Sequence, residues 1–501
     1  MHHSHQSKAS KLAFLLGTLH FGCTQTDDFI LRTRITFSKM RRLSATVTRA
    51  KNYQLQQQRE FWPVIIAISG GIIAHYAIRA FDNLDGSRTA DDDAASVHRN
   101  SFGIDIGSSL SRIAMRQAED SMPIVIENRE GKRATASCVM FLRGFHISHD
   151  SYTGTDDDSF VVGTSANESR ILKSDKTFSG SSLLPKVVPG GSSIAELQKS
   201  FIYYLLAKDL MTCATSRSDS AALLPAFVSV PNYFSAAHSS LIISACRDAG
   251  FNCVTSIPDG VSAVLGSMES GLYSRPPVRH DTVCVIDVGG GIVQLSLLLV
   301  KSVPLSIPII LSQKTLLDNG GTFFDEAIVA HLKTEFNKIH EGINVSNDKL
   351  ALQKFHDAAE AAKIELSSSS ISKIYIPFIS ADKSGPKHFE YDLSQSQLNI
   401  ILQKHFSNIN NSFEEILDAG RCQFENRTGS ADLLYGSDEV SKGSRLALNL
   451  AAVILVGGGA RMSLLFRSLQ SVTGDVPILV NAQPEETVSI GASSFSKIMK
   501  S

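Results

Sequence analysis

Two segments of the sequence place a carboxylate shortly before a tight turn that joins two apolar runs. The first is FGIDIGSSLSRIAM (102–115), with Asp105, and the second is VCVIDVGGGIVQLSLLLV (283–300), with Asp287. In both, the pattern predicts a strand, a Gly/Ser or Gly-rich turn and a second strand. Glycine lets backbone N–H groups approach phosphate oxygens, and an aspartate on each side can hold a hydrated magnesium ion. The two segments therefore predict an Mg²⁺-ATP site faced by two duplicated lobes.

A third glycine-rich segment follows an apolar run near the C-terminus. In AAVILVGGGARMSLLF (451–466), Gly457, Gly458 and Gly459 lead from a predicted strand into a helical pattern. A nucleotide can lie flat against a helix N-terminus of this kind. Each glycine turn by itself also fits ordinary turn chemistry, so the prediction depends on the order and spacing of all three.

The three segments resemble the phosphate-1, phosphate-2 and adenosine motifs of the actin, sugar-kinase and 70-kDa heat-shock superfamily. Four other segments are similar to the heat-shock branch in particular: AFVSVPNYFSAAHSSLIISACRDAGF (226–251), GGTFFDEAIVAHL (320–332), AAEAAKIELSSSS (358–370) and PEETVSIGAS (484–493). The resemblance covers about residues 102–499. It implies an α/β, two-lobed actin-like ATPase fold, with duplicated ribonuclease-H-like mixed sheets and flanking helices, that binds ATP or ADP with Mg²⁺.

The resemblance also implies roles for single residues. The phosphates would be cradled by Gly107, Ser108, Ser109, Gly289, Gly290 and Gly291. Asp105 and Asp287 would face the metal through its water shell. The ribose and adenine would be contacted by Glu360, Lys363, Ser367, Gly457, Gly458, Gly459 and Arg461. Arg461 would stack its flat guanidinium on the base.

Some of these roles have simpler alternatives. Glu360 and Lys363 stand at i and i+3 on a predicted helix, so they also fit a surface ion pair. The family's catalytic lysine corresponds best to Lys176 in SDKTFSG, with Lys173 as a rival. A solvated surface lysine is the alternative for Lys176.

The sequence departs from the family where a water would be activated. The phosphate-2 motif of the family continues as Thr-Phe-Asp, but here the residues are Ile292, Val293 and Gln294. Each lost contact is expected to reduce the rate by about tenfold to a thousandfold, whereas binding through the backbone would survive. The family's proline-containing relay turn is PDGVSAV here, with Asp259 retained and Gly260 replacing the proline. We therefore expect weak or absent hydrolysis and altered coupling between domains.

The N-terminal region differs in composition from the rest of the chain. Residues 1–60 hold ten Lys or Arg against three acids and read as a targeting segment. Residues 61–81 include eighteen consecutive uncharged residues, which predicts a single transmembrane helix, with an apolar helix packed on the core as the alternative. Residues 82–100 read as an acidic linker. The charge asymmetry fits an endoplasmic-reticulum anchor and the leader fits a mitochondrial presequence, so both locations stay open.

The remaining chain divides into two predicted lobes. Lobe I covers 101–275, with 484–501 returning to it and 142–192 as a reduced peripheral subdomain; lobe II covers 276–483, with 320–399 as its peripheral subdomain. The sequence ends soon after the closing helix of the family's ATPase domain, so we expect no peptide-binding domain.

Composition bounds the function further. The 48 basic and 49 acidic residues give no charge excess that favours nucleic acid, and the seven cysteines lack the spacing of a zinc site. The expected function is that of a membrane-tethered, ATP-binding heat-shock-type protein that assists folding or quality control through J-domain co-chaperones, exchange factors or other chaperones. The alternatives are an active ATPase, a nucleotide-free scaffold and a sugar-kinase-like phosphotransferase.

Overall fold

The computed structural model describes residues 101–117, 121–142, 160–179, 193–217, 225–274, 276, 280–301, 306–341, 343–428 and 450–499. The predicted targeting segment, transmembrane helix and linker lie outside these residues. Within the described ranges, no helix is long and apolar enough to cross a membrane.

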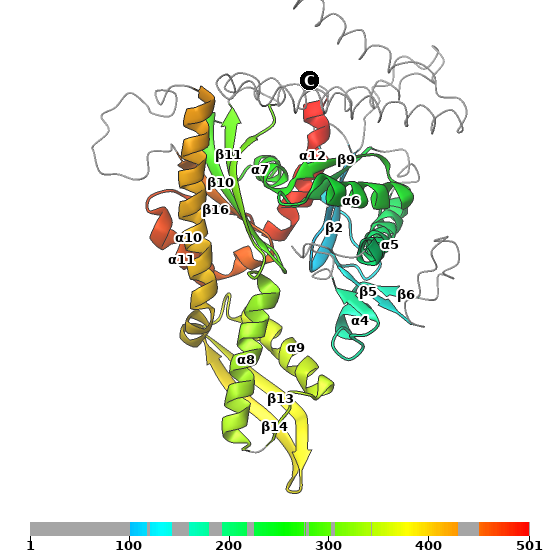
Figure 1. Ribbon diagram of the computed structural model, residues 1–501, viewed down its shortest axis with the longest axis vertical. Helices are drawn as coiled ribbons and strands as arrows, with labels where there is room; N and C mark the ends of the chain where they lie inside the picture. The colour runs from blue at the N-terminus through cyan, green and yellow to red at the C-terminus, as the bar shows by residue number, and fades with distance from the viewer. Residues whose placement is uncertain are drawn as a thin grey trace, which may run out of the picture. The chain divides into compact units, whose positions relative to one another are not determined.

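Two mixed sheets form the centre of the described chain (Figure 1). The first has the strand order β3-β2-β1-β8-β9, with β4 also paired to β2. Its strands are β1 (Ser101–Ile106), β2 (Leu110–Arg116), β3 (Ile124–Val125), β4 (Thr135–Ala136), β8 (Pro225–Val230) and β9 (Asn252–Pro258). The predicted first hairpin is thus present as β1 and β2.

The second sheet has the order β12-β11-β10-β15-β16. Its strands are β10 (His280–Val288), β11 (Val293–Lys301), β12 (Ile309–Leu316), β15 (Leu450–Val456) and β16 (Ile478–Val480). In each sheet an antiparallel hairpin is followed by two parallel neighbours, β8 and β9 in one and β15 and β16 in the other. This repeated order in a mixed α/β structure is consistent with the actin-like ATPase fold.

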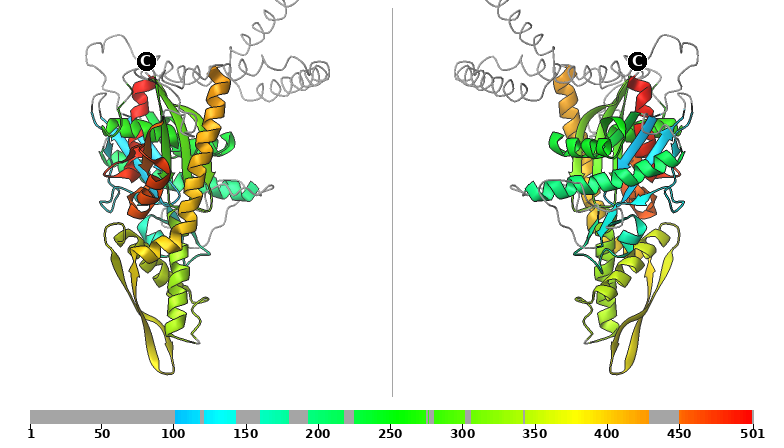
Figure 2. Two further views of the ribbon diagram at one scale, coloured as in Figure 1. Left: turned by 90° about the vertical axis from the view of Figure 1, so that its left-hand side faces the viewer. Right: turned by 90° about the vertical axis from the view of Figure 1, so that its right-hand side faces the viewer.

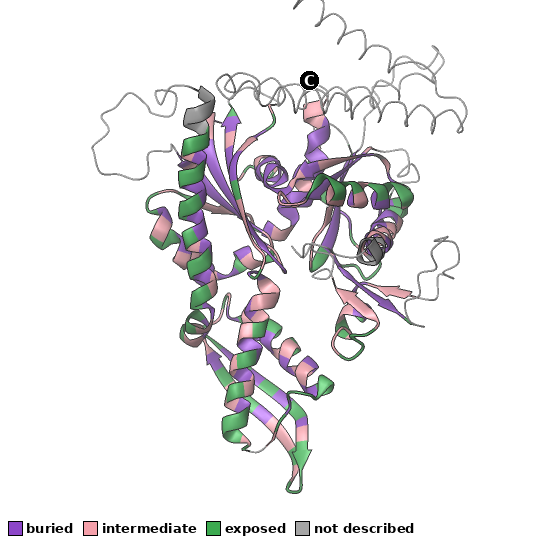
Figure 3. Ribbon diagram, in the orientation of Figure 1, coloured by how far each residue is buried: buried purple, intermediate pink, exposed green. Residues whose placement is uncertain are grey.

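Helices cover the outer faces of both sheets. The helices are α5 (Ser193–Arg217) and α6 (Ala236–Asp248) on the first sheet, and α10 (Gln395–Thr428) and α11 (Ser463–Thr473) on the second. The strands of both sheets are mostly buried (Figure 3). Near-continuous apolar runs such as VCVI and AAVILV suit strands that are covered on both faces.

Two helices, α7 (Asp259–Glu269) and α12 (Thr487–Met499), lie between the sheets (Figure 1). Their apolar residues form one core cluster with strands of both sheets. The two helices approach so closely that a Cβ at Gly266 would overlap the Thr487 carbonyl, and one at Gly491 would overlap the Ser262 carbonyl. Glycine is therefore required at this crossing.

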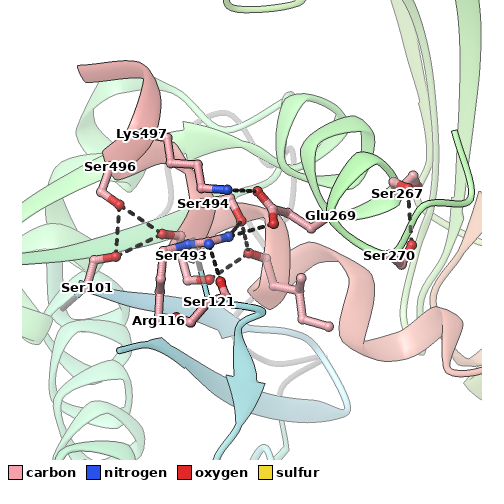
Figure 4. A network of polar contacts seen from close by, with 11 residues as sticks. Ser101, Arg116, Ser121, Ser267, Glu269, Ser270, Ser493, Ser494, Ser496 and Lys497 are labelled. Atoms are coloured by element: carbon pink, nitrogen blue, oxygen red, sulfur yellow. Dashed lines mark hydrogen bonds and ion pairs between the residues drawn. The ribbon is translucent and has the colours of Figure 1, made fainter. Parts of the chain in front are cut away.

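A buried polar network fixes α12 beside β2 and α7 (Figure 4). Arg116 is 1% exposed and pairs with Glu269 at 2.8 Å, and Lys497 reaches the same carboxylate at 3.1 Å. Arg116 also donates to Ser494 Oγ at 2.8 Å. These contacts pair the buried guanidinium with a carboxylate and connect β2, α7 and α12, so this region holds the closing helix in place.

Two smaller units extend from the sheets. One contains α8 (Gly321–Ile339), α9 (Lys349–Glu365), β13 (Ile371–Asp382) and β14 (Gly385–Ser394), and its hairpin points away from the second sheet (Figure 2). The other contains β5 (Cys138–Phe141), β6 (Phe160–Val162), β7 (Thr177–Ser179) and the short α4 (Thr164–Glu168). They touch where Ile171 N donates to Gln353 Oε1 at 3.3 Å and Lys349 Nζ donates to Ser174 Oγ at 3.3 Å.

Candidate functional site

The turns of the two hairpins contact each other. Gly291 N donates to Ser108 Oγ at 2.8 Å. A Cβ added at Gly290 would overlap the Ser109 side chain, so the second turn needs glycine at this point. The structure thus brings together the predicted phosphate-binding residues of both turns, although they lie about 180 positions apart in the sequence.

Each turn follows an aspartate in the same register. The strand register places Asp105 on β1 directly opposite Arg112 on β2. It likewise places Asp287 on β10 directly opposite Gln294 on β11. Burial raises the pKa of Asp105, and the charge of Arg112 opposes this shift. Burial, followed by the charge of Asp105, raises the pKa of Asp287 to about 7. Ionising both carboxylates is therefore costly unless a positive charge lies nearby.

This donor set fits a hydrated magnesium ion. Hard divalent cations prefer carboxylate oxygens and keep several waters, and two aspartates beside facing turns supply such oxygens. Among the described residues, no group of three or more His, Cys, Asp or Glu is arranged to hold a metal directly. The resemblance implies that Asp105 and Asp287 would hold the ion through its water.

The third glycine segment lies beside the second aspartate. Gly457 has φ 83°, and a Cβ there would lie 2.5 Å from Asp287 Oδ1 and 2.6 Å from the Val288 carbonyl oxygen. A Cβ at Gly459 would overlap the Val288 side chain, whereas one at Gly458 would meet nothing within 4 Å. Gly457 and Gly459 are thus needed for packing, and Gly458 borders open space in which a base can lie.

Arg461 ends the short 3₁₀ turn η6 (Gly458–Arg461) that follows these glycines. Its guanidinium donates to Glu485 from Nε at 3.1 Å and from Nη2 at 2.7 Å. The predicted stacking on adenine stays a prediction. A guanidinium held in its plane by a bidentate carboxylate still presents its flat face.

Lys363 lies beside the second turn. α8 begins there, because Gly321 N donates to Gly289 O at 3.0 Å and Thr322 N donates to Gly290 O at 2.7 Å. Lys363 Nζ donates to Gly321 O at 3.3 Å and pairs with Asp325 at 2.7 Å. The pair is partly buried, with 14% and 13% of the side chains exposed.

The helix α9 positions the other predicted ribose contacts. Asp348 caps it by accepting from Leu350 N at 2.9 Å and Ala351 N at 3.1 Å. Glu360 is exposed one turn before Lys363, and Ser367 Oγ donates to Lys363 O at 3.2 Å just past the helix end. The structure therefore pairs Lys363 with Asp325 and leaves Glu360 facing solvent.

A protein-family model described as "Hsp70 protein" matches residues 205–428. The matched segment contains Asp259, the second turn and the helix with Lys363, all of which the structure places around one site. This match supports an Hsp70-family ATPase domain. Asp105 and Gly457 lie outside the matched segment. Hsp70-family domains bind ATP or ADP with Mg²⁺, which agrees with the donor set described above.

Where Hsp70 proteins carry a catalytic carboxylate, this chain has a buried Gln294. The side chain is 5% exposed, its Nε2 donates to Asp259 Oδ2 at 2.9 Å, and its Oε1 accepts from Asn232 N at 3.0 Å. Ile292, in place of the family's threonine, is 6% exposed. Both replacements are thus part of the protein interior and not of a water-binding surface.

The glycine that replaces the Hsp70 relay proline also has a structural cause. A Cβ at Gly260 would lie 2.9 Å from both Cβ and Oγ of Ser296, which itself accepts from Asn232 Nδ2 at 2.6 Å. The start of α7 therefore lies against β11 too closely for a larger residue. Burial raises the pKa of Asp259 well above its ordinary value, and the charges of Asp105 and Asp287 add to this effect. The raised pKa favours the protonated carboxyl group of Asp259, whose Oδ2 accepts the hydrogen bond from Gln294 Nε2.

The structure gives Lys176, the residue predicted to correspond to the catalytic lysine of Hsp70 proteins, no contact with the two turns among the described residues. Lys176 immediately precedes β7, and its carbonyl oxygen accepts from Phe141 N at 2.9 Å. In the part of the chain that the structure describes, no contact joins its ammonium group to either turn. Lys173 is exposed. The catalytic assignment of Lys176 stays a prediction.

Two buried polar residues of the site were missed from the sequence. Asp325 is the last residue of the GGTFFD segment (320–325), and its place in this segment was the available signal. Burial raises its pKa to about 6, although Lys363 opposes the shift. Arg112 is 8% exposed, and a charged residue two positions into a strand beside a phosphate turn was the available signal.

Proposed function

We propose that this chain is an Hsp70-type nucleotide-binding protein that holds ATP or ADP with Mg²⁺ and hydrolyses ATP slowly or not at all. The observation that carries this proposal is the position of Gln294. Its amide is engaged on both sides, by Asp259 and by the backbone of Asn232, at 2.9 and 3.0 Å. An amide in these contacts cannot accept a proton from an attacking water, as a carboxylate would.

The binding half of the proposal rests on backbone groups. Backbone N–H groups of the two turns would face the phosphates, and Asp105 and Asp287 would hold the waters of the metal ion. When bound, Mg²⁺ would neutralise phosphate charge. Lys363, 3.5 Å from the Cβ position of Gly321 at the second turn, would add positive charge beside the ribose or phosphates.

The decisive experiment restores the family residues. Ile292→Thr with Gln294→Asp is expected to raise the single-turnover rate of ATP hydrolysis by about tenfold or more. Ile292→Thr with Gln294→Asn is the matched control, since it changes size in the same way but adds no carboxylate, and it should leave the rate low. A wild-type rate equal to that of an intact Hsp70 ATPase domain would contradict the proposal and favour an active ATPase.

A second candidate is a nucleotide-free scaffold. The hydrogen bond between Ser108 and Gly291, together with the packing of Ser109 on Gly290, ties the two turns directly to each other. Calorimetric titration with ADP and ATP, with and without Mg²⁺, separates the candidates. Absence of binding under all four conditions would support the scaffold.

The cellular role we propose is assistance to protein folding or quality control at a membrane. Support comes from the Hsp70 match and from the uncharged run within 61–81. The role would involve J-domain co-chaperones, exchange factors or other chaperones, in the endoplasmic reticulum or the mitochondrion. Deleting 61–81 should release the protein during carbonate washing of membranes. An unchanged membrane fraction would rule out this anchor.

A further inference from the structure

Arg112 is a buried cation without a dedicated partner. It is 8% exposed, and within the described chain its guanidinium forms no hydrogen bond or ion pair. It is the third residue of β2 and lies directly opposite Asp105. A buried charge is costly unless it is paired and hydrogen-bonded. This position therefore needs an explanation.

The acidic groups around Arg112 are largely engaged elsewhere. The groups whose charges act on it are Asp105, Glu485, Glu486 and Asp287. Glu485 is held by the two hydrogen bonds from Arg461. Glu486 is held by Arg133, with Nε to Oε1 at 2.7 Å and Nη2 to Oε2 at 2.7 Å.

The two aspartates are the remaining counter-charges. Asp105 accepts from Ser229 Oγ at 3.4 Å, and Asp287 lies beside Gly457. Asp105 and Asp287 each lie two residues before a turn, and the two turns contact each other. Arg112, directly opposite Asp105, lies at the same pair of turns, and among the described residues its donors form no hydrogen bond, so they are available to a ligand there.

We propose that Arg112 is a phosphate ligand, whose guanidinium donates to phosphate oxygens of a nucleotide held between the two turns and lets the site bind nucleotide without Mg²⁺. This rests on the proposed nucleotide binding. The planar guanidinium matches phosphate oxygens bidentately, and such charge-assisted hydrogen bonds are among the stronger ones. The corresponding position of the second hairpin, Gln294, is committed to protein contacts.

The test is calorimetric titration of the full chain with ADP, in excess Mg²⁺ and in EDTA. Wild type is expected to bind ADP in both conditions. Arg112→Ala should weaken metal-free ADP binding by about 10- to 100-fold, the loss expected for a hydrogen bond to a charged group. Arg112→Lys should restore part of it. Arg217→Ala, which removes one exposed arginine distant from the turns and paired with Glu127, is the matched control and should bind like wild type.

Adenosine serves as the probe without phosphate, and its affinity should be the same for wild type and Arg112→Ala. Circular dichroism checks that each variant is folded. If Arg112→Ala is not folded, Arg112→Lys decides alone: it should bind ADP more weakly than wild type in EDTA and bind adenosine as tightly as wild type. Equal metal-free ADP affinity of the folded variants and wild type overturns the proposal. So does wild-type binding that requires Mg²⁺ absolutely. Failure of wild type to bind ADP or ATP under any condition instead overturns the proposed function, and the role of Arg112 with it.

Discussion

The two hairpins at the centre of the molecule share one geometry and differ in what their polar side chains do. Asp105 faces Arg112 and Asp287 faces Gln294 at equivalent places in register. In the first hairpin the facing side chain is left without a hydrogen bond among the described residues. In the second it is bound to Asp259. The two hairpins therefore have the same backbone geometry, but Arg112 of the first presents a charge and Gln294 of the second joins β11 to α7.

The neighbouring strands extend this difference. Beside Asp105 stands Ser229 of β8, whose hydroxyl donates to the carboxylate at 3.4 Å. Beside Asp287 stands Val456 of β15, followed by Gly457 in a positive-φ conformation. Asp287 is thus supported by close packing and Asp105 by a hydrogen bond. Substitutions in the second hairpin should mainly affect stability, and those in the first should mainly affect binding.

The largest effect is expected at Gly457. Gly457→Ala should lower the free energy of unfolding by about 3 kcal/mol or more, because it adds positive-φ strain to a clash with the Val288 carbonyl. Gly458→Ala is the control and should change stability by less than about 0.5 kcal/mol, since its Cβ meets nothing. Urea unfolding of both variants measures the difference. Similar losses for the two would show that packing around Asp287 is not as tight as the structure indicates.

The next effect compares the two side chains that face the aspartates. Gln294→Leu should cost about 2–3 kcal/mol, because it removes the hydrogen bonds to buried Asp259 and to the partly buried Asn232 N–H. Arg112→Met, of similar length, should cost less than about 1 kcal/mol, because it removes a charge that forms no hydrogen bond among the described residues. Guanidinium chloride unfolding of the nucleotide-free proteins checks this. If Arg112→Met is the more damaging change, the two hairpins have the opposite roles.

The sequence predicted the elements of the site better than the partners of its polar groups. Strands at 102–115 and 283–300, the strand before Gly457 and the helix with Lys363 are all present. Such elements follow from local patterns of apolar residues and glycine. The duplicated motif also predicted that the two turns face one site, whereas the hydrogen bond between Ser108 and Gly291 was not predicted.

The pairing of buried polar side chains could not be read from local patterns. Lys363 was predicted to contact the ribose, with a surface ion pair to Glu360 on the same helix as the alternative, and the structure pairs it with Asp325 from α8. Gln294 was recognised as a lost carboxylate, yet its bond to Asp259 depends on how α7 packs on β11. Such contacts are set by tertiary packing between segments distant in sequence.

A further effect concerns pH. The pKa of Asp287 is raised to about 7, above an unfolded value near 4. Between these values the folded protein keeps a proton that the unfolded chain has lost, so the free energy of unfolding should decrease as pH rises from about 4 to about 7. One proton accounts for at most about 1.4 kcal/mol per pH unit. Urea unfolding of nucleotide-free protein in EDTA should show this slope, and Asp287→Asn should flatten it. An unchanged slope in the variant would mean that Asp287 ionises normally.

The smallest effect tests the direct tie between the hairpins. Ser108→Ala removes the acceptor for Gly291 N and should lower the free energy of unfolding by about 1 kcal/mol, the usual net value of one hydrogen bond. Ser109→Ala is the matched control, because in the part of the chain that the structure describes its hydroxyl forms no hydrogen bond. Saturating Mg²⁺-ADP should reduce the difference between the variants, since phosphate oxygens can then accept from the N–H groups of both turns. A difference that persists unchanged with bound nucleotide would show that the two turns stay joined to each other, which favours the scaffold over the nucleotide-binding protein.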